Sequence, residues 1–193
     1  MKGSAARAVA KDQRKLMAEL VSAVSSTMDV PAEPAEVFQG LCTAMGKRRG
    51  RPVVLTIRPF PAEVADNTTG LWLDLPEQDV IVVEESLTPD HQLVVLGHEL
   101  WHMHAGHCGH DLGGSTTAAA RAAFQDQVDW PELARRVAAR SHSDQADEVD
   151  AEAFGLLVST RIAGWLATPG APRQHDDVAR RLRESLGYLG PQG

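Results

Sequence analysis

Residues 87–106 read LTPDHQLVVLGHELWHMHAG and hold the start, the body and the end of one predicted helix. Thr88 is a suitable N-cap, Pro89 fits the first helical position, and Asp90 places a negative charge in the first turn. Gly106 is a natural stop, because glycine readily adopts the left-handed conformation found just beyond many helices. The stretch therefore predicts a helix that begins at Pro89 and ends before Gly106.

This helix carries the pattern His-Glu-x-x-His, from His98 to His102. Residues four apart lie on one face of a helix, so both imidazoles can bind one tetrahedral zinc ion at about 2.0–2.1 Å. Glu99 is directed past the metal and can accept a proton from a metal-bound water, whose pKa falls toward about 7. A buried helix with two hydrogen-bonded histidines is the alternative. The crowding of histidines in residues 97–110 disfavours it, because each buried one needs a polar partner.

A catalytic zinc ion takes three protein ligands and keeps a fourth position open. The third ligand is expected from the long helix predicted over residues 143–167, which begins with several carboxylates. Asp150 shares a face of that helix with Phe154 and Leu157, at plus four and plus seven. Because an apolar face should point inward, we predict that Asp150 is the third metal ligand.

Glu148 is the alternative third ligand. It shares a helix face with Glu152 and Gly155, which is less apolar than the face of Asp150. Glu152 is a candidate acceptor for the second N–H of a ligating imidazole. A second metal site built from His104, His107, Cys108 and His110 is a weaker possibility, since such residues at a helix end are more often exposed.

The remaining patterns predict an α+β fold. Hydrophobic residues at three- and four-residue steps indicate helices over residues 6–27 and 34–46. Three apolar or alternating runs indicate strands, at residues 52–59, 70–76 and 79–86. Short connections favour a small, mostly antiparallel three-stranded sheet packed against a helical bundle. The zincin-like His-Glu-x-x-His helix would belong to that bundle.

Composition favours a cytoplasmic protein without membrane attachment. The 193 residues include 19 Lys and Arg against 26 Asp and Glu, so direct nucleic-acid binding is disfavoured. The basic run at residues 47–51 is interpreted as a solvated turn. No run of about 20 apolar residues occurs. The two cysteines, Cys42 and Cys108, are interpreted as reduced thiols.

The order of motifs resembles the ImmA/IrrE family of metallopeptidases. HELWHMHAGH and, further on, DAEAFGLLVS stand in the places of that family's two motifs. CTAMGKRRGRPVVL and GLWLDLPEQDVIVVEES are similar to the segment before the first motif in actinobacterial members, which are often described as toxin or regulator components of toxin–antitoxin pairs. The resemblance covers roughly residues 30–165.

The resemblance implies a cytoplasmic zinc metalloendopeptidase that cleaves a helix-turn-helix transcriptional repressor. Zn²⁺ would be bound by His98, His102 and Asp150, and Glu99 would be the general base. The sequence departs from the family pattern at two places. Asp150 stands where a longer glutamate is usual, and Trp101 stands where a small residue is common.

The alternative function is a non-proteolytic, metal-stabilised toxin or regulator component that binds a DNA-binding partner without cutting it. The shorter Asp150 and the bulky Trp101 favour this alternative. In either case we expect three parts in the chain. These are an N-terminal helical extension at residues 1–29, a metallopeptidase-like domain at 30–168, and a C-terminal helix and tail at 169–193.

Overall fold

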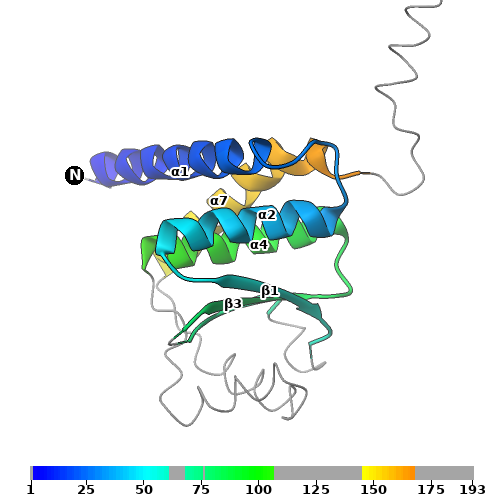
Figure 1. Cartoon of the computed structure of the whole chain (residues 1–193). Coiled ribbons are helices and arrows are strands. Elements are labelled where there is room, and N and C mark those ends of the chain that lie inside the picture. The colour runs from blue at the N-terminus through cyan, green and yellow to red at the C-terminus, as the bar shows by residue number, and fades with distance from the viewer. Residues whose placement is uncertain (1, 61–67, 76, 107–144, 168–193) are drawn as a thin grey trace, which may run out of the picture.

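A computed structural model of the chain describes residues 2–60, 68–75, 77–106 and 145–167. Figure 1 shows the arrangement of the elements in this part of the chain. In chain order the elements are helices α1 (Lys2–Ser25) and α2 (Pro34–Arg49), strands β1 (Val53–Arg58), β2 (Gly70–Asp74) and β3 (Asp79–Glu84), helices α4 (Pro89–Ala105) and α7 (Gln145–Ile162), and the 3₁₀ helix η1 (Ala163–Trp165).

The three strands form a mixed sheet in the order β1-β3-β2. β2 and β3 are antiparallel neighbours, with Trp72 opposite Ile81, whereas β1 runs parallel to β3 on its other side. The prediction of an α+β fold is confirmed, but the prediction of a mostly antiparallel sheet is wrong. β2 follows β1 in the chain but lies at the opposite edge of the sheet, and β3 then lies between them. β1 and β2 are therefore not hairpin neighbours.

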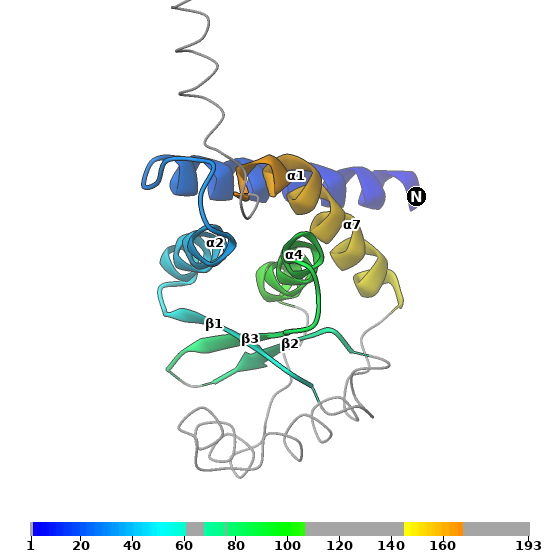
Figure 2. The ribbon, with the colours of Figure 1, turned by 90° about the vertical axis from the view of Figure 1, so that its right-hand side faces the viewer.

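The helices lie on one face of this sheet. Figure 2 shows α2 and α4 directly above the strands, α7 beside α4, and α1 on the side of α2 and α4 that faces away from the sheet. On α2, Val37, Leu41 and Met45 lie at four-residue steps and have no solvent exposure. Ile81 and Val83 of the central strand join the same apolar core. In the described residues, no helix has both the length and the apolar character needed to cross a membrane.

Helix α1 is part of the main core. Leu16, Leu20 and Val24 are at most 2% exposed and belong to the same apolar cluster as α2 and α4. Gln13 donates a hydrogen bond from Nε2 to the backbone oxygen of Asp150 in α7, at 2.8 Å. The helical extension predicted at residues 1–29 is therefore tied to α7 by this hydrogen bond and to α4 through the shared core. The predicted tail at residues 169–193 lies outside the described residues.

Helices α4 and α7 touch through two glycines. A Cβ atom on Gly97 would lie 3.0 Å from the Cα atom of Gly155, and a Cβ atom on Gly155 would lie 2.5 Å from the backbone oxygen of Val94. Helix axes are ordinarily 8–10 Å apart, according to the side chains between them. Here the missing side chains let the two backbones approach each other directly.

A buried charge cluster joins α2 to the sheet. Asp79, which is fully buried at the start of β3, accepts hydrogen bonds from Arg49, Arg51 and the indole Nε1 of Trp72. Arg51 also binds Asp74 on β2. Burial by itself would raise the pKa of Asp79, but the hydrogen bonds from Arg51, Trp72 and Arg49 hold it below its usual value.

The interpretation of the basic run as a solvated turn is therefore wrong for two of its residues. Arg49 and Arg51 are about three-quarters buried and are bound to Asp79. Arg48 is more exposed and pairs with Glu19 of α1. These arginines stabilise the packing of α2 and leave little of the run free to bind a nucleic acid.

Gly155→Ala is expected to destabilise the protein by about 1–3 kcal/mol, because the new methyl group would meet backbone atoms that cannot move independently. The matched control is Gly164→Ala, where an added Cβ would meet no atom within 4 Å. Its effect should stay within about 0.5 kcal/mol. Urea denaturation measures both changes, and equal effects of the two substitutions would contradict the close helix contact.

Asp79→Asn is expected to cost about 3 kcal/mol of stability at pH 7, because it leaves two arginines without their buried carboxylate. Since the folded-state pKa of Asp79 is lowered, its contribution is complete above the unfolded pKa of about 3.9 and is lost as the pH falls below it. The stability difference between wild type and variant should therefore shrink between pH 5 and pH 2. Asp74→Asn, at a more exposed position, should cost at most about 1 kcal/mol. A difference that does not change with pH would contradict this assignment.

Candidate metal centre

Helix α4 begins and ends where the sequence predicts. Thr88 has an extended conformation before Pro89, although its side chain makes no capping hydrogen bond. Gly106 adopts the left-handed conformation (φ 69°), and its N–H donates to the backbone oxygen of His102. His102 therefore lies in the last turn of α4 and His98 lies one turn earlier.

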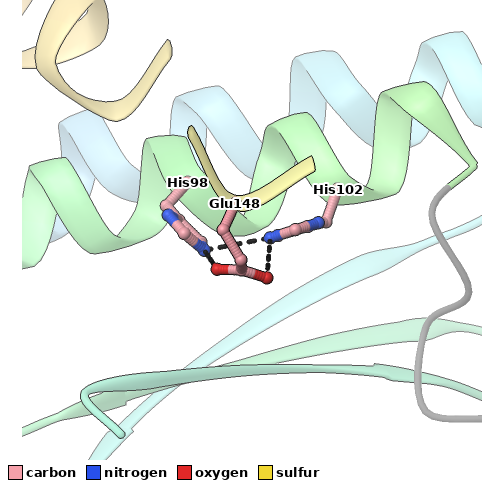
Figure 3. Close-up of side chains that lie close together, drawn as sticks. All are labelled: His98, His102 and Glu148. Carbon is pink, nitrogen blue, oxygen red and sulfur yellow. Dashed lines mark hydrogen bonds and ion pairs between the residues drawn. The ribbon is translucent and has the colours of Figure 1, made fainter. Parts of the chain in front are cut away.

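His98, His102 and Glu148 form a compact group, shown in Figure 3. The Nε2 atoms of the two histidines are 3.0 Å apart. One carboxylate oxygen of Glu148 lies 3.3 Å from His98 Nε2, and the other lies 3.4 Å from His102 Nε2. Two ligands thus come from α4 and the third from the first turn of α7, as a metal site between two helices requires.

These side chains could hold one metal ion, because one ligand atom from each residue lies within 4.8 Å of the others. In a tetrahedral site with bonds of about 2.0–2.1 Å, the ligand atoms stand about 3.3 Å from one another. The two histidine nitrogens are a few tenths of an ångström closer than this, and each lies near a different oxygen of Glu148. Among the described residues this is the single group of three potential metal ligands with such mutual distances.

The carboxylate at the histidines is that of Glu148, so the preference for Asp150 as third ligand is not what the geometry supports. Phe154 does contact α4, because its ring packs against Trp101. The two backbones approach each other at Gly155, seven residues after Glu148. The backbone oxygen of Asp150 accepts a hydrogen bond from Gln13 of α1. The helix face that carries Glu148 and Gly155 is therefore the one that brings a carboxylate to the two histidines.

Glu99 lies against the edge strand β2. It is 8% exposed, and its Oε1 atom would be 2.8 Å from a Cβ atom on Gly70. Burial, together with the charge of Glu148, raises the pKa of Glu99 to about 8, although a hydrogen bond from the backbone of Trp72 partly opposes both effects. In the metal-free chain at neutral pH, this carboxyl group is therefore mostly protonated.

The imidazole of His98 is kept in its neutral form. Burial lowers its pKa, and the charges of Glu148 and Glu152 only partly counter that effect. Neutral imidazole is the form that binds metal ions. Glu152 is itself exposed, and it acts on His98 through its charge. Its predicted role as an acceptor for an imidazole N–H remains a prediction.

The other residues singled out in the motif have structural contacts. Trp101 is 3% exposed and packs against Phe154, with ring centroids 5.3 Å apart. It fills core space on the α7 side of α4. His104 lies 2.9 Å from a carboxylate oxygen of Asp12 in α1. His107, Cys108 and His110, the other members of the possible second metal site, lie outside the described residues.

Comparison with known proteins found no matching family model, no similar curated protein and no similar solved structure. The site is therefore assigned from the geometry of its own residues. The sequence pattern identified His98, Glu99 and His102, whereas the roles of Gly70 and Gly155 were missed. The sequence does contain a signal for these contacts. It is the presence of small residues on the faces of α7 and β2 that meet α4.

Glu148→Gln is expected to weaken zinc binding at least tenfold, because the carboxamide removes an anionic ligand from a three-ligand site. Asp150→Asn is the matched control, since it makes the same kind of change two residues away on the same helix. Its zinc affinity should stay within twofold of wild type. Competition titration with a chromophoric chelator measures both constants. Weaker binding in Asp150→Asn than in Glu148→Gln would restore Asp150 as the third ligand.

Proposed function

We propose that this protein is a zinc-dependent endopeptidase. The observation that carries the proposal is the meeting of His98, His102 and Glu148 at distances suited to one tetrahedral ion. A glutamate directly after the first histidine completes the set of groups used for metal-assisted hydrolysis. When bound, zinc would supply a Lewis acid that activates water and polarises a peptide carbonyl.

Glu99 is proposed as the general base that takes the proton from the attacking water. Its raised pKa means that it must first lose its own proton. A divalent cation bound beside it would favour the charged carboxylate and lower that pKa. Because Gly70 has no side chain, Glu99 can lie directly against β2. The sheet therefore fixes the position of the proposed base.

The proposed substrate is a helix-turn-helix transcriptional repressor, cut once to release transcription. The proposed substrate is inferred from the resemblance of the two motifs to ImmA/IrrE metallopeptidases, together with the α+β architecture that holds them. Neither of the two departures from the family pattern counts against catalysis. The ligand position suited to zinc is occupied by Glu148, and Trp101 packs in the core.

The second candidate is a metal-stabilised toxin or regulator component that binds a DNA-binding partner without cutting it. The burial of Glu99 against β2 favours this candidate, because a general base must be reached by the water that it activates. In this function the ion would hold α4 and α7 together and Glu99 would be a packed side chain without a catalytic role.

Glu99→Gln separates the two candidates. The substitution is nearly isosteric and spares all three ligands, so zinc content and the partner complex should be retained while cleavage is lost. The measurement incubates zinc-loaded wild type and variant with candidate helix-turn-helix regulators from the same organism, and follows fragments by mass spectrometry. The matched control is Glu36→Gln, which changes an exposed carboxylate on α2 and should cleave at nearly the wild-type rate.

Cleavage by Glu99→Gln at the wild-type rate would exclude Glu99 as the base. A stable complex with zinc-loaded wild type that yields no fragments would exclude the endopeptidase and favour the second candidate.

A further inference from the structure

The C-terminal turn of α4 is bound by an arginine from another helix. Arg49, the last residue of α2, donates a hydrogen bond from Nη1 to the backbone oxygen of Met103, at 2.9 Å. Met103 directly follows His102. The contact therefore lies one residue from a proposed metal ligand, although Arg49 itself does not belong to the metal-binding group.

This contact satisfies a group that a helix leaves unpaired. The last four carbonyl oxygens of a helix have no partner within it. At the end of α4, the N–H of Gly106 takes the carbonyl of His102, and Arg49 takes the carbonyl of Met103. His98 lies a full turn further inside the helix, where the regular hydrogen bonds continue. His102 is thus the ligand whose backbone depends on the end of α4.

The guanidinium group of Arg49 is itself fixed in place. Its Nε and Nη2 atoms lie 2.6 Å and 3.4 Å from the two carboxylate oxygens of the buried Asp79. Its Cζ atom lies 5.4 Å from the ring centroid of Trp72, whose Nε1 also donates to Asp79. A planar guanidinium held by a carboxylate and an aromatic ring has a defined orientation, which a lysine cannot reproduce.

We propose that Arg49 is a positioning residue for the metal centre, acting by holding the last turn of α4 and thereby the imidazole of His102. The inference rests on the proposed metal site and adds a group that supports it from α2. The connection runs from Asp79 on β3 through Arg49 to the end of α4. Loss of the Arg49 side chain would free the last turn and widen the range of positions of His102.

Arg51 provides a matched control within the same cluster. Like Arg49, it is partly buried and donates to Asp79. Its other contacts go to Asp74 and to the backbone oxygen of Leu75, and none goes to α4 among the described residues. Removing either arginine disturbs the charge cluster, but only removal of Arg49 disturbs the helix end that carries His102.

The test compares wild type, Arg49→Gln and Arg51→Gln by titration with Co²⁺, whose visible absorption reports both occupancy and tetrahedral geometry. Circular dichroism first verifies that each variant is folded at the titration temperature. We expect Arg49→Gln to bind Co²⁺ about tenfold more weakly than wild type, with a weaker tetrahedral absorption band. Arg51→Gln should bind within twofold of wild type, even if both variants lose similar thermal stability.

If Arg49→Gln does not fold, Arg49→Lys takes its place, since it keeps a positive charge near Asp79 but cannot bind Asp79 and the Met103 carbonyl together. Equal Co²⁺ affinities and spectra in the Arg49 and Arg51 variants would overturn the positioning role while the metal site stands. A folded wild type that binds no Co²⁺ would overturn the metal site, and this inference with it.

Discussion

The direct contact between α4 and α7 is the constraint on which the candidate site depends. Gly97 and Gly155 bring the two backbones together, and any larger residue at Gly155 would strike the backbone oxygen of Val94. His98 follows Gly97 immediately, and Glu148 lies seven residues before Gly155 on the same face. The contact therefore determines which carboxylate of α7 reaches the two imidazoles. Gly97 and Gly155 therefore shape the site although neither residue can bind a metal ion.

The site combines groups that disfavour one another in the metal-free chain. Burial of Glu99, together with the charge of the nearby and partly exposed Glu148, raises the pKa of Glu99 to about 8. His98 is held neutral by burial. A divalent cation would relieve this arrangement, because it favours the charged carboxylates and binds neutral imidazole. The electrostatics of the group are those expected of a site built for a cation.

The stability of the surrounding fold comes from elsewhere. The apolar core joins α1, α2, α4, α7 and the sheet, and the buried Asp79 binds two arginines beside it. Because the core and the Asp79 cluster lie outside the candidate site, the stability of the fold does not depend on the charges of Glu99 and Glu148. Arg49 is the link between the two regions, since it binds both Asp79 and the end of α4.

Much of this arrangement could be predicted from the sequence. Thr88, Pro89 and Gly106 marked the ends of α4 within a residue, and the histidine spacing identified one face of it. The strand order, which was predicted wrongly, and the choice between Asp150 and Glu148 both depend on which surfaces meet in three dimensions. Hydrophobicity indicates that a face is buried, but it does not reveal where two helix backbones approach each other through glycines. The positions of Asp79 and Arg49 likewise follow from tertiary packing, which no local pattern contains.

The metal content of the purified protein, measured by mass spectrometry for wild type and for His98→Ala prepared in parallel, tests the proposed metal centre most directly. We expect one zinc ion per wild-type chain and its loss in the variant. Wild type with well under one ion per chain after zinc loading, or a variant that keeps the wild-type content, would contradict it.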